Sequence, residues 1–171
     1  MNLALFGFMG VGKTAIGHVL AEKTGYTFID LDDEIVAKAG KSIPRIFEED
    51  GEACFRGIEK AVALEVALGD RQVIACGGGA ILNQEIRRGL EKSSRMILLT
   101  AEPATILERV EAQGGTRPLL QVEDKIAEIQ RLLSERNPHY LSAADIVVDT
   151  TGKISAQVAD DIMSLLEVDD A

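Results

Sequence analysis

The sequence predicts an α/β fold in which helices flank a mostly parallel sheet. Two observations support this prediction: short apolar runs alternate with longer amphipathic segments, and residues typical of helix ends separate them. The chain has 171 residues, of which 46% are hydrophobic and 27% are charged, a balance typical of a globular domain with its own core. We therefore expect residues 1–171 to form a single domain with right-handed crossovers between strands.

Five short apolar runs are expected to form buried strands, at residues 3–6, 27–29, 73–75, 96–99 and 146–148. Amphipathic segments are expected to form helices near residues 14–24, 55–68, 83–91, 103–112, 123–136 and 155–166. Gly25 and Gly69 stand where helix C-caps belong. Ser42 before Ile43-Pro44 is typical of a helix N-cap with proline in the first turn.

Two segments exceed what a simple alternation of strands and helices needs. Residues 32–60 hold more helical material than one crossover requires, and residues 112–122 hold Gly114-Gly115 followed by Arg117-Pro118. Long excursions in a compact domain usually serve function. We expect residues 32–60 to be a substrate-binding segment and residues 112–122 to be a lid.

Charge and composition exclude several classes of function. The formal net charge is −10, and an acidic protein repels the phosphate backbone of a nucleic acid. The N-terminus lacks the basic region of a signal peptide, and no apolar run is long enough to span a bilayer. We expect a cytoplasmic protein with no nucleic-acid or membrane partner. Cys54 and Cys76 show neither metal-site nor disulfide spacing, so both are expected to be small buried apolar residues.

A glycine-rich octet follows the first predicted strand and opens the first predicted helix. Residues 7–14 read Gly-Phe-Met-Gly-Val-Gly-Lys-Thr and match the P-loop pattern in full. Backbone N–H groups and a helix N-terminus there attract phosphates. We expect Lys13 to reach the β- and γ-phosphates of ATP and the Thr14 hydroxyl to hold Mg²⁺. The expected ATP contacts from this loop are Gly10, Val11, Gly12, Lys13 and Thr14.

Two aspartates, Asp30 and Asp32, close the second predicted strand. On a strand, residues i and i+2 point the same way, so both carboxylates would project at the sheet edge where α/β proteins bind ligands. One can hold Mg²⁺ or its waters while the other orients an attacking hydroxyl. The alternative is a helix N-cap formed by Asp32 or Asp33. Because no acidic residue ends the strand at 73–75, Asp30 is the candidate for the metal.

Glycines and arginines supply the remaining candidates. Gly77, Gly78 and Gly79 end a strand and permit close approach of a ligand, although a flexible turn is the alternative. Glu52, Arg56 and Glu59 share one helical face, and a surface ion pair there would contribute only about 0.3–0.5 kcal/mol.

Two more arginines lie farther along the chain. Arg117 lies in a loop from which it could swing over phosphates. Arg136 precedes Asn137-Pro138 near a predicted helix end, where the alternative role is a favourable cation at the negative end of the helix dipole.

Taken together, these motifs resemble the shikimate kinase family over nearly the whole chain. The matching features are the octet at 7–14, Phe28-Ile-Asp-Leu-Asp32, Phe55-Arg56-Gly-Ile-Glu59, Gly77-Gly-Gly-Ala80, Arg117-Pro-Leu-Leu120, and Arg136 four residues before Tyr140. The resemblance implies a P-loop kinase fold like that of nucleoside monophosphate kinases, with a five-stranded parallel sheet in the order 2-3-1-4-5. It implies phosphorylation of the 3-hydroxyl of shikimate by ATP, in chorismate and aromatic amino-acid biosynthesis.

The resemblance also implies roles for individual residues. Asp30 would position Mg²⁺, and Asp32 would bind substrate hydroxyls and serve catalysis together with Lys13 and Arg117. Arg56, Gly78 and Arg136 would bind shikimate, with Glu59 supporting Arg56. Gly79 completes the expected substrate site, and Arg117 would touch phosphates from the lid.

The chain departs from the family pattern at two positions. Arg109 is followed by Val110 rather than threonine, so the resemblance does not carry a nucleotide contact to Arg109. The loop at 149–153 lacks a later proline, which leaves Lys153 as the candidate on the adenine side. We expect a monomer with shikimate and ATP as its partners.

Two alternative functions remain open at this point. A gluconate kinase or a nucleotide kinase would share the phosphate loop, although a pair of arginines suits a substrate with a carboxylate. A non-catalytic ATP-binding regulator would need the loop alone. The combination of Lys13, Asp32 and Arg117 argues against that second alternative, because binding alone does not require a base-like aspartate.

Overall fold

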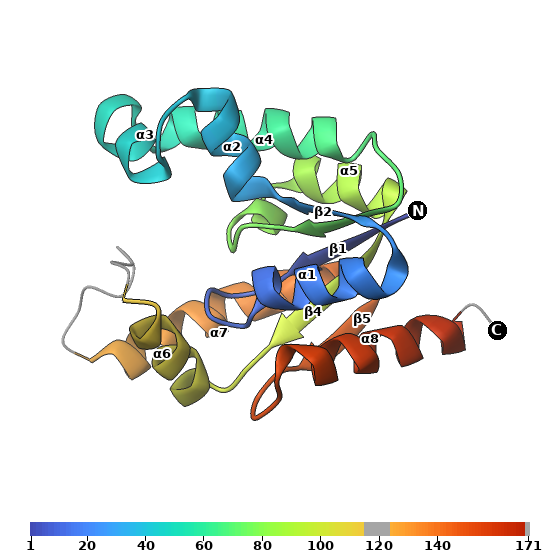
Figure 1. Cartoon of the computed structure of the whole chain (residues 1–171). Coiled ribbons are helices and arrows are strands. Elements are labelled where there is room, and N and C mark those ends of the chain that lie inside the picture. The colour runs from blue at the N-terminus through green and yellow to red at the C-terminus, as the bar shows by residue number, and fades with distance from the viewer. Residues whose placement is uncertain (115–123, 170–171) are drawn as a thin grey trace.

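The structure is a computed structural model that describes residues 1–114 and 124–169 (Figure 1). It contains one five-stranded parallel sheet in the order β2-β3-β1-β4-β5. The strands are β1 (Asn2–Phe6), β2 (Thr27–Asp30), β3 (Gln72–Ala75), β4 (Ser94–Thr100) and β5 (Ile146–Asp149). The predicted fold class and strand order are therefore confirmed, and each predicted strand lies within an observed one.

The helices cover both faces of the sheet. They are α1 (Lys13–Thr24), α2 (Leu31–Ala39), α3 (Ile43–Asp50), α4 (Glu52–Val66), α5 (Gln84–Ser93), α6 (Pro103–Ala112), α7 (Lys125–Ala143) and α8 (Ser155–Asp169), with a short 3₁₀ turn, η1 (Ala80–Leu82). In the order β2-β3-β1-β4-β5, the connection from β1 to β2 runs along the sheet in one direction, and all later connections run in the other. Because such connections are right-handed, α1 lies on one face of the sheet and α4, α5 and α7 lie on the other. Helix α8 packs beside α1, and α7 passes behind the sheet in Figure 1.

Residues 32–60 contain most of α2, all of α3 and the first part of α4, so the predicted excess of helical material is confirmed. Helices α2 and α3 both pack on α4. Ser42 caps α3 by accepting a hydrogen bond from the Arg45 N–H, with proline in the first turn, as predicted. This helical segment projects beyond the carboxyl end of β2 in Figure 1.

Three local predictions were wrong. Helix α4 is capped at Ala67 rather than Gly69, because the chain leaves the helix through a tight turn in which the Gly69 N–H reaches the Val66 carbonyl. Helix α7 continues through Pro138 to Ala143. Proline inside a helix costs about 3 kcal/mol, and burial of Tyr140 and Ala143 beyond it offsets that cost.

The third correction concerns the cysteines. Cys76 is buried at the end of β3, as predicted, whereas Cys54 is exposed on α4. Cys54 precedes Phe55, which is the residue of that turn that enters the core. Among the described residues, no helix combines the length and the apolar character that crossing a bilayer would require.

Candidate active site

The loop between β1 and α1 requires glycine at its tight positions. Gly7, Gly10 and Gly12 have φ values of 145°, 77° and 96°, which other residues adopt only with strain. A Cβ on Gly7 would lie 2.3 Å from the Leu99 carbonyl oxygen. Gly12 is the N-cap of α1 and offers no side chain to the helix N-terminus. The backbone is therefore shaped as a cradle that leaves room for an anion at the positive end of α1.

A cavity of about 370 Å³ opens at this cradle. It lies at the carboxyl edge of β1, β2 and β3, where ligands bind in open α/β sheets. The lining residues are Met9, Gly10, Gly12, Lys13, Thr14, Ala15, Asp30, Asp32, Ala75, Cys76, Gly77, Gly78 and Gln113. They include the predicted residues of the phosphate loop except Val11, which is buried, together with both aspartates and Gly78. The predicted residues Arg56, Gly79 and Arg136 are not among them.

Lys13 folds over the cradle. Its Nζ donates hydrogen bonds to the carbonyl oxygens of Gly7, at 2.8 Å, and Phe8, at 2.9 Å. The two bonds hold the ammonium group in the wall of the cavity, beside the helix N-terminus. This is a local concentration of positive charge in a protein whose formal net charge is −10, as binding of a polyphosphate requires.

Asp30 joins the end of β2 to the cradle. Its Oδ1 accepts a hydrogen bond of 2.9 Å from the Asp32 N–H, and its Oδ2 accepts one of 3.1 Å from the Thr14 hydroxyl. Asp30 is thus the N-cap of α2, whereas the N-cap alternative in the sequence pointed to Asp32 or Asp33. One oxygen caps the helix while the other faces Thr14, so capping does not exclude a metal role.

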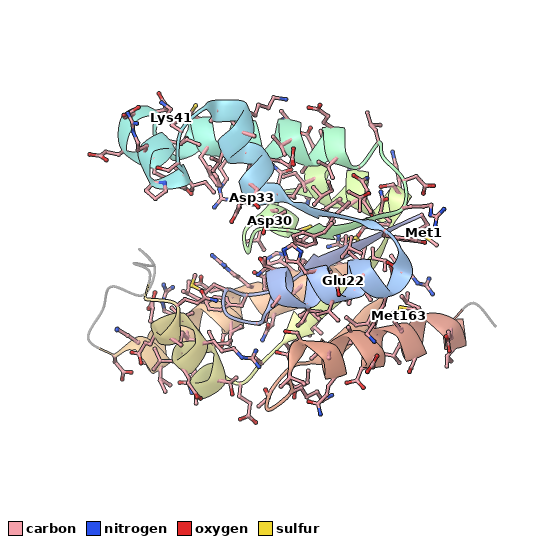
Figure 2. All side chains as sticks on the ribbon, in the orientation of Figure 1. Met1, Glu22, Asp30, Asp33, Lys41 and Met163 are labelled. Carbon is pink, nitrogen blue, oxygen red and sulfur yellow. The ribbon has the colours of Figure 1, made fainter. Side chains whose placement is uncertain are left out.

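Asp32 reaches the cavity by a different route from the one predicted. It lies in the first turn of α2 rather than on β2, so the period of two along a strand does not apply. Its carboxylate nevertheless lines the cavity, and its Oδ1 lies 3.4 Å from where a Cβ on Gly77 would be. Figure 2 shows Asp30 at the point where β2 gives way to α2.

The oxygen donors around Thr14 and Asp30 suit Mg²⁺, which is usually held by one or two carboxylates together with substrate phosphates and water. Within the described part of the chain, no group of three or more His, Cys, Asp or Glu side chains could hold a metal ion. A metal here would therefore depend on bound phosphates for the rest of its ligands.

Arg56 lies against the glycine turn that follows β3. Its NH1 donates a hydrogen bond of 2.8 Å to Oε1 of Glu59, whose side chain is only 3% exposed. A Cβ on Gly79 would fall 2.8 Å from the same NH1. The guanidinium also packs 5.2 Å from the centre of the Phe55 ring. Because its main partner is buried, this arrangement differs from the surface ion pair considered as the alternative.

Arg136 approaches the same turn from α7. Its guanidinium carbon lies 5.5 Å from the centre of the Phe8 ring, and its NH1 lies 3.4 Å from where a Cβ on Gly78 would be. Helix α7 continues well past Arg136, so the alternative of a cation in the last turn is wrong. Arg56, on α4, and Arg136, on α7, therefore approach adjacent glycines of the same turn.

Arg117 and most of the predicted lid, from residue 115 onward, fall outside the described residues. Lys153 does not line the cavity, and its Nζ pairs with Oδ2 of Asp161 on α8 at 2.7 Å. Only Gln113, at the end of α6, reaches the cavity from the described start of that segment.

Sequence reasoning missed the link between Arg109 and Thr150. Arg109 donates from NH1 to the Thr150 hydroxyl oxygen at 2.8 Å and from NH2 to the Thr150 carbonyl at 2.7 Å. The Thr150 hydroxyl lies within hydrogen-bond distance of the carbonyl oxygens of Thr100, at 2.9 Å, and Val11, at 3.1 Å, and NH1 of Arg109 also donates to the Gly10 carbonyl at 3.3 Å. These bonds tie the phosphate loop to the loop after β5. Thr150 is buried in the fold, but a lone threonine after a strand gives no sequence signal of this role.

Cys76 lines the cavity as a neutral group. Burial is the main cause that raises the pKa of its thiol to about 12, and the nearby Lys13 opposes this only in part. The thiolate is the nucleophilic form of cysteine. Cys76 is therefore an unreactive wall of the cavity at physiological pH.

The parallel sheet, the phosphate cradle at β1 and the converging arginines define a small-molecule kinase of the P-loop class. The family model described as shikimate kinase matches residues 9–167. The chain belongs to the shikimate kinase family.

Relatives of known name agree over nearly the full length. A shikimate kinase of Symbiobacterium thermophilum is 41% identical, with 98% of this chain and 97% of that protein covered. One from Neisseria meningitidis serogroup C is 40% identical, with 97% and 94% covered.

Solved structures show the same fold. The shikimate kinase of Acinetobacter baumannii, solved in complex with shikimate, superposes with a TM-score of 0.92 at 36% identity, covering 98% of this chain and 93% of that one. A gluconokinase from Sinorhizobium meliloti gives a TM-score of 0.55 at 16% identity, covering 95% and 89%. The second comparison shows a shared fold alone, so the fold does not by itself separate these two kinds of kinase.

Proposed function

We propose that this protein transfers the γ-phosphoryl group of ATP to the 3-hydroxyl of shikimate, giving shikimate 3-phosphate and ADP. The observation that carries the proposal is the convergence of Arg56 and Arg136 on the glycine turn after β3. Two arginines that converge on one turn suit a carboxylate, because the planar guanidinium fork matches its geometry. The A. baumannii relative supports the same substrate, since it was solved with shikimate bound.

The phosphate cradle would bind ATP. Backbone N–H groups of residues 10–14 would surround the phosphates at the N-terminus of α1, and Lys13 would turn from its carbonyl partners to the β- and γ-phosphates. Thr14 and Asp30 would hold Mg²⁺ from one side. When bound, the ion would supply positive charge that neutralises the negative charge developing on the phosphates during transfer.

Asp32 would orient the attacking hydroxyl and accept its proton. The Asp32 carboxylate lines the cavity between the phosphate cradle and the glycine turn. Arg56 and Arg136 would bind the carboxylate of the substrate, and the backbone of Gly78 and Gly79 would contact its ring. The hydroxyls of the substrate would then face Asp32. Catalysis would then depend on positioning and on charge stabilisation rather than on covalent chemistry. Arg117, from the predicted lid, is proposed to add a further cation to the phosphates.

The test is a comparison of acceptors. Purified protein with MgATP is assayed for ADP release with shikimate, gluconate and AMP in separate reactions, each with and without EDTA. We expect rapid release with shikimate only, and its loss when EDTA removes Mg²⁺. Turnover of gluconate or AMP with no response to shikimate would overturn the assignment.

Two further proposals concern the state of the protein in the cell. We propose that it is cytoplasmic and monomeric, with no nucleic-acid or membrane partner, which fits its acidity. Light scattering after size-exclusion chromatography measures the mass of the protein in solution. Immunoblots of the soluble and membrane fractions of the source cells show where the protein is located. A dimer mass or a membrane-bound fraction would contradict them.

A further inference from the structure

Tyr140 is a buried residue whose polar group points at the glycine turn of the candidate site. Its side chain, on α7, is only 1% exposed. The phenol hydroxyl donates a short hydrogen bond to the Gly78 carbonyl oxygen. The ring packs edge-on against Phe6 of β1, with ring centres 6.0 Å apart and an angle of 65° between planes. The hydroxyl is therefore held in one place by the core.

Burial also keeps this hydroxyl a donor. Burial raises the pKa of Tyr140 above its ordinary value, and the positive charge of Arg136 opposes that rise only in part. The phenol is therefore protonated at physiological pH and can donate to the carbonyl. The carbonyl oxygen of the half-buried Gly78 would lose this donor if the hydroxyl were removed.

Gly78 is the point at which two substrate-binding elements meet. Arg136 and Tyr140 are four residues apart on α7 and so lie on one face of that helix. Both reach Gly78: Tyr140 at the carbonyl, and Arg136 with NH1 at 3.4 Å from where a Cβ would stand. The peptide between Gly78 and Gly79 is trans, so fixing the Gly78 carbonyl turns the Gly79 N–H to the opposite side.

We propose that Tyr140 is a positioning residue for the acceptor substrate, which locks the glycine turn after β3 to Arg136 on α7. The proposal rests on the function proposed above. Tyr140 touches no reacting atom. It acts by setting the direction of the Gly78–Gly79 peptide and its distance from the Arg136 guanidinium. Removal of the hydroxyl should therefore weaken binding of the carboxylate substrate while leaving the phosphate cradle unchanged.

The experiment is Tyr140→Phe, which keeps the ring against Phe6 and removes only the hydroxyl. The matched control is Tyr26→Phe, the same change in the other tyrosine of the chain. Tyr26 lies directly before β2, at the amino end of that strand, whereas the candidate site lies at the carboxyl ends of the strands. KM for shikimate and for ATP, kcat and the thermal midpoint are measured for both variants and wild type.

We expect Tyr140→Phe to raise KM for shikimate about tenfold, equal to ~1.4 kcal/mol, with KM for ATP within about twofold of wild type. Tyr26→Phe should leave both KM values unchanged. A lower thermal midpoint with both KM values unchanged would overturn the proposal, because it would make the hydroxyl merely structural. A rise in KM for ATP as large as that for shikimate would overturn it as well.

A double-mutant cycle tests the link to Arg136. In an Arg136→Ala background, Tyr140→Phe should raise KM for shikimate by less than about threefold, because the guanidinium relative to which the Tyr140 hydroxyl positions the glycine turn is already absent. A full tenfold rise in that background would disprove the coupling. Wild-type turnover with shikimate is the internal reference. If wild type fails to use shikimate, the proposed function fails. If wild type uses shikimate and the Tyr140→Phe variant equals it, only this inference fails.

Discussion

The Thr14 hydroxyl donates a hydrogen bond of 3.1 Å to Oδ2 of Asp30. Thr14 lies in the first turn of α1, and Asp30 ends β2, which is separated from β1 by β3 in the sheet. The bond therefore joins two elements whose strands lie on either side of β3, and both residues line the cavity. Because the other carboxylate oxygen of Asp30 caps α2, Oδ2 is the oxygen left to share with a metal. Substitutions that keep the cap but remove the charge can separate the two roles.

Asp30→Asn should preserve the fold and weaken the use of Mg²⁺. Asparagine caps helices about as well as aspartate, so the thermal midpoint should stay close to that of wild type. The Mg²⁺ concentration that supports half-maximal turnover should rise about tenfold or more, since Mg²⁺ prefers a carboxylate oxygen. Asp33→Asn, three residues on in α2 and outside the cavity lining, is the control (Figure 2). A Mg²⁺ requirement equal to wild type in Asp30→Asn would rule out a metal role.

Lys13→Ala should nearly abolish turnover without unfolding the protein. The Nζ of Lys13 donates to two carbonyl oxygens of its own loop, whereas at the phosphates it would stabilise charge in the transition state. Activity assays and circular dichroism on the same preparation check this. Near-normal turnover would show that ATP does not react at this loop.

Asp32→Asn should reduce kcat more than it weakens ATP binding. An amide keeps much of the hydrogen bonding but cannot accept the hydroxyl proton, and general-base assistance is worth about 10²–10⁴-fold. Single-turnover rates together with ATP affinity from calorimetry separate the two effects. If ATP affinity falls while the rate of the chemical step is kept, Asp32 serves the metal or the fold instead.

Arg136→Ala should raise KM for shikimate about a hundredfold. Truncating one partner of a charged contact typically costs about 2–5 kcal/mol, and each ~1.4 kcal/mol is tenfold. KM for ATP should change little. Arg131→Ala is the matched control, because Arg131 lies on the same helix but is exposed and pairs with Glu128 and Glu135. Equal KM values for the two variants would remove Arg136 from the site.

The two cysteines should differ sharply toward alkylation. The pKa of the buried Cys76 thiol is raised to about 12, so it carries almost no thiolate below about pH 10. Cys54 is exposed. Iodoacetamide at about pH 8 should modify Cys54 alone in native protein, and both residues after denaturation, as read by peptide mass spectrometry. Rapid native labelling of Cys76 would show that the wall of the cavity opens to solvent.

The sheet was predictable because its signal is local. Each strand is a short apolar run, and the glycine octet after β1 identifies the edge where ligands bind. The boundaries of α7 were not predictable, because Pro138 is a stop signal that only tertiary burial of Tyr140 overrides. Asp30 and Asp32 were placed together correctly but for the wrong reason, since α2 begins between them.

Contacts between distant segments were out of reach of the sequence. The role of Arg109 is not predictable from the sequence, because its partner Thr150 is 41 positions away and no sequence motif joins the two residues. The hydroxyl of Tyr140 meets Gly78 across 62 positions. Only the family resemblance predicted that Arg56 and Arg136 serve the same site. Their approach to the glycine turn depends on how α4 and α7 pack around it, which no local pattern encodes.

The identity of the phosphorylated product tests the central claim most directly. The protein is incubated with MgATP and equal amounts of shikimate and gluconate, and the products are resolved by proton–phosphorus correlation NMR. The account predicts one new phosphate ester whose phosphorus couples to the proton at carbon 3 of shikimate. A phosphorus signal coupled to gluconate protons, or to another position of shikimate, would contradict it.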